Sequence, residues 1–337
     1  MVFLQGMKIN DVLKAFIRSR KLFRNWLTAF IETSLAVMGV TKKNYINVRC
    51  LDGGIDKIPL IAYMRLLYAL YKDTVRSYNS HDRFVEAVNG MRIPLGEVIH
   101  GDSHVFNALL EGWNYDAVRG YWFKGNLKFK HMYYFILEIF ERGVYSPLNV
   151  SGRDVIDVGA FVGGSSVFFA LNGARRIVAL EPHPKAYQQL IENIKLNRLE
   201  EKVIPVNAAL ASRKGFIDLA VIDVNEASIA KSPLSRFLDS ERKGNRVEIV
   251  TLEEMIKHYN INEGVLKMDC EGCEYDIILN DFEHIELFDE LIFEYHAQYT
   301  KTPADILLKT LAKSFYCERV GPHYSSYQGI IYCVNKR

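Results

Sequence analysis

The chain has 337 residues, of which 49% are hydrophobic and 24% are charged, and its formal net charge is +2. This composition excludes a disordered, collagen-like or acidic-tail protein, and the length allows about two domains. The charge is uneven, because residues 1–50 contain nine Lys and Arg but only two Asp and Glu. Any contact with a polyanion or with an anionic membrane surface is therefore expected at this end of the chain.

The cysteines and the apolar segments bear on the compartment. The five cysteines are Cys50, Cys270, Cys273, Cys317 and Cys333. An odd number in a chain this long does not resemble a secreted disulfide framework, so reduced thiols and a cytoplasmic location are expected. The apolar run at residues 26–40 is shorter than the roughly 20 residues that cross a membrane, and it begins too deep in the chain for a signal peptide.

Residues 1–130 predict a small α+β segment, to which we assign a lid or acceptor-binding role as a hypothesis. Residues 8–40 have the spacing of one or two amphipathic helices, and residues 60–76 have helical spacing as well. Residues 45–50 alternate as a strand does. The pair Asn89-Gly90 between two apolar runs predicts a hairpin with a type I′ turn, and a second hairpin is expected at residues 121–129.

Residues 131–337 are expected to form the second domain, in which strands and helices alternate from Arg153 onward. Strands are expected at 155–158, 177–180, 203–206, 216–222, 247–250, 265–268 and 291–294, with a polar insertion at 224–245 and a closing antiparallel pair at 316–320 and 329–334. This alternation predicts an α/β fold with a doubly wound, mostly parallel sheet.

A glycine-rich turn follows the first of these strands. Its sequence, Asp157-Val-Gly159-Ala160-Phe-Val-Gly163-Gly-Ser165, differs from the G-x-G-x-x-G of a dinucleotide-binding turn. An acid two residues before the first glycine would repel a pyrophosphate. It would suit a ligand that carries an amino group and a sulfonium cation, such as S-adenosylmethionine (SAM). A dinucleotide site and a purely structural turn are the alternatives.

Polar residues at the ends of the next two strands favour SAM. Glu181-Pro182 closes the second strand, where a carboxylate can accept both ribose hydroxyls, and Asn207-Ala208 closes the third, where an adenine edge would lie.

The second informative stretch follows the strand at 265–268. Asp269 ends that strand, and Glu271 and Glu274 are three residues apart at a helix start, so they are expected to share a face. Glu294 ends the following strand and His296 lies next to it. Because ligands bind outside the carboxyl ends of the strands in an open α/β sheet, these groups are expected to converge with the glycine turn on one edge.

Taken together, these motifs resemble the FkbM-type SAM-dependent methyltransferases over about residues 150–334. The resemblance depends on Asp157-Val-Gly-Ala-x-x-Gly, Ala179-Leu-Glu181-Pro182, Asn207-Ala-Ala-Leu, Lys267-x-Asp269-x-Glu271-Gly272-x-Glu274 and Phe293-Glu294-Tyr-His296. It implies methyl transfer from SAM, usually to a hydroxyl oxygen of a sugar or secondary metabolite. Two features depart from the pattern: Cys270 and Cys273 lie inside the acidic stretch, and a long segment precedes the domain.

Cofactor contacts are assigned to Asp157, Gly159, Ala160, Gly163, Ser165, Glu181, Pro182, Asn207, Ala208 and Asp269. Catalysis is assigned to Glu271, Glu274, Glu294 and His296, because a hydroxyl acceptor needs a base beside it. No resident metal is expected. The alternatives are helix-start electrostatics for the two glutamates of the acidic stretch, and Mg²⁺ held by Asp269, Glu271, Glu294 and His296. Zinc or a redox pair at Cys270-x-x-Cys273 is a further alternative, and an ion pair is expected for Lys267.

The favoured function is therefore O-methylation of a sugar, glycolipid or small metabolite. A nucleic acid partner is not favoured, although Glu192-Asn-Ile-Lys-Leu-Asn197 resembles tRNA methyltransferases, because Asp269-Cys-Glu-Gly stands where those enzymes usually carry an Asn-Pro-type or cysteine motif. A SAM-binding protein with a role at a membrane surface is the other alternative. The basic N-terminus provides for peripheral membrane contact, and the sequence leaves the oligomeric state open.

Overall fold

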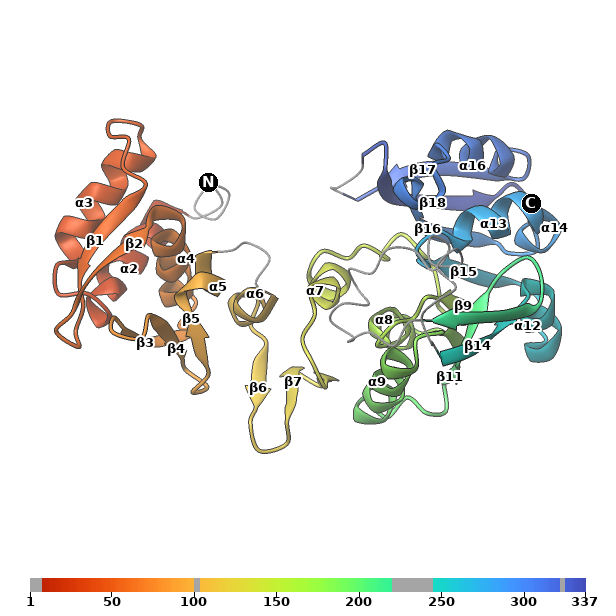
Figure 1. The fold of residues 1–337 in the computed structure, drawn as a ribbon, viewed down its shortest axis with the longest axis horizontal. Helices are drawn as coiled ribbons and strands as arrows, with labels where there is room; N and C mark the ends of the chain where they lie inside the picture. The colour runs from red at the N-terminus through yellow and green to blue at the C-terminus, as the bar shows by residue number, and fades with distance from the viewer. Residues whose placement is uncertain (1–7, 100–103, 220–244, 322–324) are drawn as a thin grey trace. The chain divides into compact units, whose positions relative to one another are not determined.

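A computed structural model of the chain describes residues 8–99, 104–219, 245–321 and 325–337 (Figure 1). Its internal contacts divide the chain into two compact units, Met1–Leu137 and Glu138–Arg337. Of the insertion expected at 224–245, all but the last residue lies outside the described residues. None of the described helices combines the length and the apolar composition that crossing a membrane requires.

The first unit combines short helices with antiparallel strands, as the sequence predicted. Its elements are α2 (Ile9–Arg18), η1 (Ser19–Lys21), α3 (Trp26–Val37), β1 (Tyr45–Arg49), β2 (Ile55–Pro59), α4 (Leu60–Tyr71), β3 (Val75–Asn79), β4 (Phe84–Ala87), β5 (Arg92–Pro94), α5 (Leu95–Ile99), α6 (His104–Leu110), β6 (Asn114–Asp116), β7 (Tyr121–Lys124) and β8 (Leu127–Phe129), and α7 (Tyr134–Glu141) spans the unit boundary. The strands form three small sheets, β1–β2, β3–β4–β5 and β6–β7–β8. The apolar helix α4 is mostly buried and supplies the centre of this unit.

The hairpin predicted around Asn89-Gly90 is present, since β4 and β5 pair antiparallel. Gly90 has a positive φ of 84°, but Asn89 is not among the residues with positive φ. A type I′ turn needs positive φ at both central residues, so the predicted turn type is wrong. The Ala87 N–H instead donates to the Met91 carbonyl at 2.8 Å, which closes a loop one residue longer than a two-residue turn.

The second unit is built on a seven-stranded sheet with the order β11-β10-β9-β15-β16-β18-β17. Its elements are β9 (Asp154–Val158), α8 (Gly164–Leu171), β10 (Arg176–Leu180), α9 (Pro184–Leu196), β11 (Val203–Val206), β12 (Ala208–Leu210), β13 (Gly215–Leu219), β14 (Asn245–Val250), α12 (Leu252–Tyr259), β15 (Gly264–Met268), α13 (Cys273–Asn280), α14 (Phe282–Ile285), β16 (Glu290–His296), α15 (Ala297–Thr300), α16 (Ala304–Leu311), β17 (Phe315–Val320) and β18 (Gln328–Asn335). Neighbouring strands are parallel except that β18 is antiparallel to β16 and β17. The predicted doubly wound, mostly parallel sheet is confirmed. The strands expected at 216–222 and 247–250 correspond to β13 and β14, which form a separate three-stranded sheet with β12.

Both faces of this sheet are covered, which is why its central strands are buried along their whole length. On one face Asp157 of β9 binds two serines at the start of α8. On the other face the alternate residue Val158 belongs to a buried cluster with Ile277 of α13 and Leu307 of α16. Figure 1 shows α8 and α9 beside β9 and β11, and α13 and α16 beside β15 to β18. The carboxyl ends of β9, β10, β15 and β16 therefore meet at one edge of the sheet.

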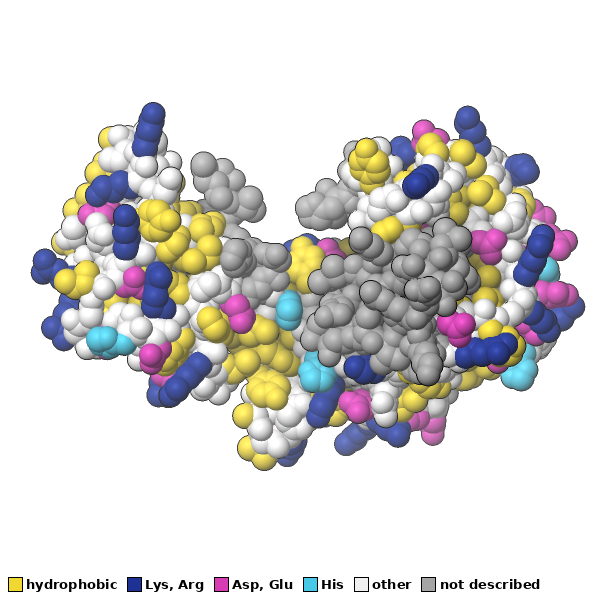
Figure 2. Space-filling model, viewed as in Figure 1, with side chains coloured by type: hydrophobic (Ala, Val, Ile, Leu, Met, Phe, Trp, Pro, Cys, Tyr) yellow, Lys and Arg dark blue, Asp and Glu magenta, His cyan; other side chains and the backbone are white. Residues whose placement is uncertain are grey.

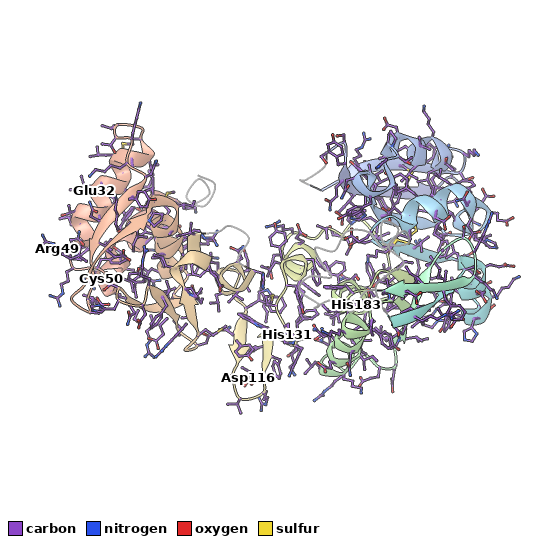
Figure 3. The ribbon with its side chains drawn as sticks, viewed as in Figure 1. Glu32, Arg49, Cys50, Asp116, His131 and His183 are labelled. Carbon is purple, nitrogen blue, oxygen red and sulfur yellow. A yellow bond between two sulfur atoms is a disulfide. The ribbon has the colours of Figure 1, made fainter. Side chains whose placement is uncertain are left out.

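Four of the five cysteines form disulfides, so the expectation of five reduced thiols is wrong for this structure. Cys317 and Cys333 are directly opposed on β17 and β18 and are joined at a Cα–Cα distance of 4.1 Å. Cys270 and Cys273 are joined within the acidic stretch. Cys50 is free and buried in the first unit (Figure 3). A count of cysteines could not reveal the Cys317–Cys333 pair, because strand register decides which cysteines of neighbouring strands face one another.

Candidate active site

The glycine turn (residues 157–165) joins β9 to α8 and packs closely against the chain that follows β15. Gly159 and Gly163 both have positive φ, 71° and 89°, which glycine adopts without strain. A Cβ added to Gly159 would lie 1.8 Å from the Asp269 carbonyl oxygen, and one added to Gly163 would lie 2.6 Å from Leu190 Cδ1. Both positions therefore require glycine, one for contact with the acidic stretch and one for contact with α9.

Asp157 lies beneath the glycine turn and has no exposed surface. Its Oδ2 accepts hydrogen bonds from the hydroxyls of Ser165 (2.7 Å) and Ser166 (2.6 Å), and its Oδ1 lies 3.0 Å from Lys267 Nζ. Lys267 Nζ also donates to the carbonyls of Val158 (3.1 Å) and Gly159 (2.8 Å). The ion pair expected for Lys267 is thus confirmed. In this structure Asp157 and Ser165 are buried supports of the turn rather than groups open to a ligand.

Glu181 lies at the carboxyl end of β10 and holds the glycine turn in place through a hydrogen bond. Its two carboxylate oxygens accept hydrogen bonds from the N–H groups of Phe161 (2.8 Å) and His183 (2.7 Å). Burial raises the pKa of Glu181 to about 7, although these hydrogen bonds act in the opposite direction. Asn207 donates to the carbonyls of Glu181 (2.8 Å) and Pro182 (3.2 Å), so the two strand ends are held together.

The N–H groups of the glycine turn are mostly engaged within the protein. Those of Gly159 and Ala160 both donate to the Leu180 carbonyl at 3.0 Å, and that of Gly163 donates to Ala160 at 2.7 Å. These three N–H groups are therefore not free to bind a ligand, because the tight turn uses them to fix its own shape. Ala208 is the first residue of β12 and is buried.

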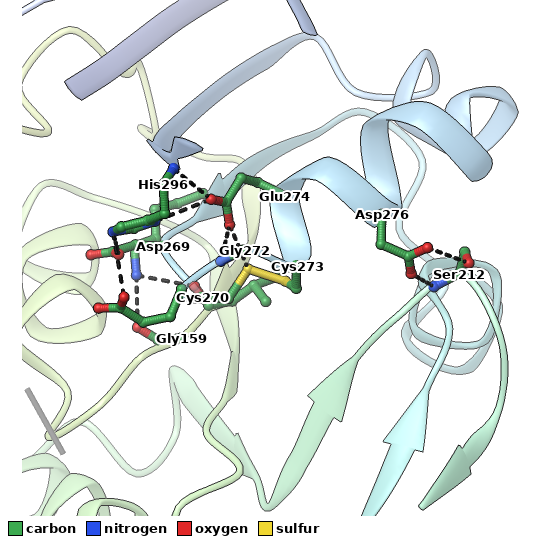
Figure 4. The surroundings of a disulfide bond; sticks show 12 residues. Gly159, Ser212, Asp269, Cys270, Gly272, Cys273, Glu274, Asp276 and His296 are labelled. Atoms are coloured by element: carbon green, nitrogen blue, oxygen red, sulfur yellow. Dashed lines mark hydrogen bonds and ion pairs between the residues drawn. A yellow bond between two sulfur atoms is a disulfide. The ribbon is translucent and has the colours of Figure 1, made fainter. Parts of the chain in front are cut away.

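The acidic loop (residues 269–274) connects β15 to α13 and contains the expected catalytic glutamates. Glu274 is fully buried and accepts hydrogen bonds from the Gly272 N–H (2.9 Å), the His296 N–H (3.0 Å) and His296 Nδ1 (3.1 Å) (Figure 4). Glu271 has a left-handed backbone, φ 59°, and its side chain is 30% exposed. The two glutamates thus do not share an exposed face: Glu274 holds His296, and Glu271 is partly open.

His296 lies at the end of β16, surrounded by acids. Its Nε2 lies 3.8 Å from Glu271 Oε2 and 4.0 Å from Asp269 Oδ1, and its Nδ1 faces Glu274. Burial alone lowers the pKa of His296, but the hydrogen bond to Glu274 and the nearby acids outweigh it and raise the pKa to about 10. The ring is therefore a cation at neutral pH, which makes it a donor and not a base.

Two further acids of this cluster have raised pKa values. Burial raises the pKa of Glu271 to about 7, with Asp269 and Glu274 adding to the effect and His296 opposing it. Burial and the charge of Asp269 also raise the pKa of Glu294, whose Oε1 accepts a hydrogen bond from Gln328 at 2.5 Å. Glu271 is the partly exposed acid of this loop whose charge changes near neutral pH.

Two tyrosines that were not predicted from the sequence lie at the site. The Tyr145 hydroxyl lies 3.5 Å from Asp269 Oδ2, and the Tyr299 ring stacks on His296 with centroids 5.8 Å apart. Tyr299 comes three residues after His296, so the short α15 could have suggested it. Tyr145 is 124 residues from Asp269 in sequence, and no motif around it indicates that it lies at the site.

The alternatives that involve a metal can be compared with this geometry. One ligand atom each from Asp269, Glu271 and His296 lie within 4.8 Å of one another, so these three residues could hold a cation, which would displace the proton of His296. Cys270 and Cys273 are joined in a disulfide in this structure, and in this oxidised form neither offers the thiolate that zinc needs.

The sheet order with its one antiparallel strand, the glycine turn after β9 and the acid after β10 define a Rossmann-like methyltransferase fold. Residues 157–313 match the family model of the Methyltransferase FkbM domain. This part of the chain is therefore a methyltransferase domain of the FkbM type, as its motifs predicted.

The chain is also similar to several characterised proteins and solved structures. It is 34% identical over 89 residues to the Ribosomal protein L11 methyltransferase of Geobacter sp., a match of 26% of this chain and 29% of the relative. It is 30% identical over 130 residues to the tRNA (guanine(37)-N(1))-methyltransferase Trm5b of Methanocaldococcus jannaschii, a match of 38% of this chain and 37% of the relative. The chain thus matches less than two fifths of the length of either relative. The crystal structure of the methyltransferase FkbM from Methylobacillus flagellatus KT aligns with a TM-score of 0.41 and 13% identity, over 59% of this chain and 47% of that one.

Proposed function

We propose that the protein transfers a methyl group from SAM to a hydroxyl oxygen of a sugar, a glycolipid or a small metabolite. The observation that carries this proposal is the contact between the glycine turn and the acidic loop. The Asp269 N–H donates a hydrogen bond to the Val158 carbonyl at 3.1 Å. Lys267, on the strand β15 that precedes Asp269, donates a hydrogen bond from Nζ to the Gly159 carbonyl. A cofactor at the turn and an acceptor at Glu271 would therefore be neighbours.

The residues of the turn fit SAM. Gly159 and Gly163 fix the shape of the turn through their close contacts with Asp269 and Leu190. Each Glu181 oxygen that accepts one N–H retains a second lone pair for a ribose hydroxyl. Asn207 stands at the next strand end, on the side assigned to adenine. Bound SAM supplies a methyl group that its sulfonium has already activated. Asp157 contributes indirectly, because it fixes the turn through its serine and lysine partners.

In this proposal Glu271 is the general base. Its pKa of about 7 lets it be ionised at working pH and still accept a hydroxyl proton. His296 remains a cation, 3.8 Å from Glu271, and stabilises the carboxylate before the proton arrives. Glu274 is a positioning residue, because it fixes both the backbone and the ring of His296. Such a base typically contributes 10²–10⁴-fold in rate, as an order of magnitude.

Calorimetry and product labelling test the proposal in sequence. Titration with SAM and with S-adenosylhomocysteine should show binding by the wild type and by Glu192→Ala, an exposed acid on α9, and weaker binding by Glu181→Ala. Labelled SAM offered to fractionated cell extract should then yield a labelled glycan, lipid or small metabolite. Equal affinity for all three proteins would contradict the assignment of the cofactor site.

The similarity to a tRNA methyltransferase supports RNA methylation as a second candidate function. The basic residues 1–50 provide charge for phosphate contacts. Treating the extract with ribonuclease before labelling separates the two candidates. Label that disappears after ribonuclease would favour RNA, whereas label that persists in a non-nucleic fraction supports the hydroxyl acceptor.

We also propose peripheral contact of the first unit with an anionic membrane surface at the cytoplasmic side. Ile9, Leu13 and Ile17 form an exposed stripe on α2, and Leu27 and Ile31 form another on α3. Figure 2 shows dark-blue basic side chains next to yellow hydrophobic ones over the unit drawn in red and orange in Figure 1. Apolar area framed by basic charge is typical of helices that lie on anionic membranes. Co-sedimentation with phosphatidylserine vesicles should be lost in Leu13→Glu/Ile17→Glu, and cell fractionation tests the compartment.

A further inference from the structure

A disulfide lies inside the acidic loop, in contact with the group that holds His296. Cys270 and Cys273 are joined between Asp269 and Glu274 (Figure 4). The Cys270 sulfur lies 3.3 Å from Glu274 Oε2, while Oε1 of the same carboxylate binds the backbone and the ring of His296. A change in the redox state of this pair would therefore act directly on Glu274, the residue that positions His296.

Reduction would change two features of the loop. A disulfide sulfur carries no proton, whereas a Cys270 thiol can donate a hydrogen bond to Glu274 and alter the charge that faces His296. The disulfide also bridges two residues with left-handed backbone, Glu271 at φ 59° and Gly272 at φ 119°. Such a conformation is unfavourable for glutamate and persists only where its surroundings enforce it. Loss of the disulfide would let Glu271 leave its position beside His296.

The pair is also chemically suited to exchange. Cys270 and Cys273 are both partly exposed, whereas in the other disulfide Cys317 is partly exposed and Cys333 is fully buried. Cys273 is the first residue of α13, where the helix N-terminus stabilises a thiolate and makes it a good leaving group. A separation of 3 residues restricts the unfolded chain less than the 16 residues between Cys317 and Cys333, so stability is the weaker reason for this disulfide.

We propose that Cys270–Cys273 is a reversible redox-modification site that controls the acidic loop, with the disulfide as the form competent for methyl transfer. The redox step requires a dithiol reductant. One of its thiolates attacks the Cys270 sulfur, the S–S bond breaks and Cys273 leaves as a thiolate. The second thiolate of the reductant then attacks the mixed disulfide and releases Cys270. Two electrons and two protons pass to the protein, and the reductant becomes a disulfide.

The first experiment tests the chemistry independently of any activity. The native protein is equilibrated with graded ratios of reduced to oxidised dithiothreitol, alkylated and analysed by peptide mass spectrometry. Cys270–Cys273 should open at less reducing ratios than Cys317–Cys333 and should close again on oxidation. If the two disulfides open together or in the opposite order, the proposal is overturned.

The second experiment tests control of the site, and it rests on the proposed function. In Cys317→Ser/Cys333→Ser, which retains only the loop disulfide, dithiothreitol should lower turnover of the labelled acceptor by at least about tenfold. Affinity for S-adenosylhomocysteine should change by no more than a few-fold. Cys270→Ser/Cys273→Ser should have the low turnover at once and should not respond to dithiothreitol.

The outcomes distinguish the two hypotheses. If S-adenosylhomocysteine binds in neither redox state, the proposed function fails while the exchange chemistry is still measured by alkylation. If it binds in both states and turnover is the same before and after reduction, the redox control fails. Hydrogen exchange adds a readout that does not depend on the acceptor: the amides of Gly272 and His296, which Glu274 protects, should exchange faster after reduction.

Discussion

The glycine turn and the acidic loop meet at the same edge of the sheet but treat their carboxylates differently. In the glycine turn Asp157 is paired with Lys267 and two serines, and both oxygens of Glu181 accept N–H groups. The acidic loop instead gathers Asp269, Glu271 and Glu274, together with Glu294, around a single histidine.

The difference separates supporting acids from reactive ones. A buried acid matched by a cation and by hydrogen bonds, as Asp157 is, stabilises the backbone around it. In the acidic loop, burial raises the pKa values of Glu271 and Glu294 toward neutrality, and the charges of neighbouring acids add to this effect. On this reasoning Asp157 fixes the shape of the glycine turn, whereas Glu271 of the acidic loop exchanges a proton. Glu181 has a pKa that burial raises to about 7, so it combines hydrogen bonding to the turn with a charge that changes near neutral pH. Four substitutions test this contrast.

The largest effect is expected for Lys267→Met. It removes the cation from a pair in which both side chains are buried, and it leaves the Asp157 charge without compensation. The free energy of unfolding should fall by about 3–5 kcal/mol, measured by urea denaturation. Lys257→Met, at an exposed pair with Glu253, should cost less than about 1 kcal/mol. Similar losses in the two variants would show that the buried pair contributes no more to stability than the exposed one.

Glu271→Gln should depress turnover by at least about a hundredfold, because it keeps the shape but removes the base. Affinity for S-adenosylhomocysteine should remain within a few-fold of the wild type. The wild-type rate should rise as pH passes through about 7, where Glu271 loses its proton, and the variant should lack this rise. The exposed Glu283→Gln serves as the matched control. Near-normal turnover in Glu271→Gln would show that a different residue is the general base.

Glu181→Gln should weaken S-adenosylhomocysteine binding about tenfold at pH 8, because it replaces a charged hydrogen-bond acceptor with a neutral one. Wild-type affinity should increase as pH rises through about 7, because the ionised carboxylate accepts the ribose hydroxyls, and the variant should be flat. The contribution of Glu181 to the free energy of unfolding changes with pH in the opposite direction. Since the folded pKa is raised from 4.5, the contribution of this group to stability is complete below pH 4.5 and is lost as pH rises through about 7. Calorimetry and thermal unfolding across pH check both.

The smallest effect is expected for Glu294→Gln. The raised pKa of Glu294 means that the acid holds its proton near neutral pH, and glutamine reproduces that neutral form. Turnover should change by less than about threefold, a loss of no more than one weak hydrogen bond. Glu294→Ala should cost more, because it also removes the acceptor for Gln328. A large loss in Glu294→Gln would show that a charged Glu294 is needed.

Much of the fold was accessible from the sequence because local patterns encode it. The strands at 155–158, 177–180, 203–206 and 265–268 were predicted from apolar runs that end in glycine or acid, and the structure confirms them as β9, β10, β11 and β15. The antiparallel closing pair was predicted for the same reason. What failed was register and turn detail, such as the conformation of Asn89 and the pairing of Cys317 with Cys333, since both depend on which residues come to face one another.

The sequence by itself determined the sheet, the glycine turn and the set of polar residues at its edge, because the carboxyl ends of parallel strands must meet there. Only the tertiary structure decided the state of each group. It buried Glu274 under His296, paired Asp157 with Lys267 and left Glu271 partly open beside a disulfide. Charge state and hydrogen bonding depend on neighbours from distant parts of the chain and on the exclusion of water. The local spacing of residues therefore does not predict them.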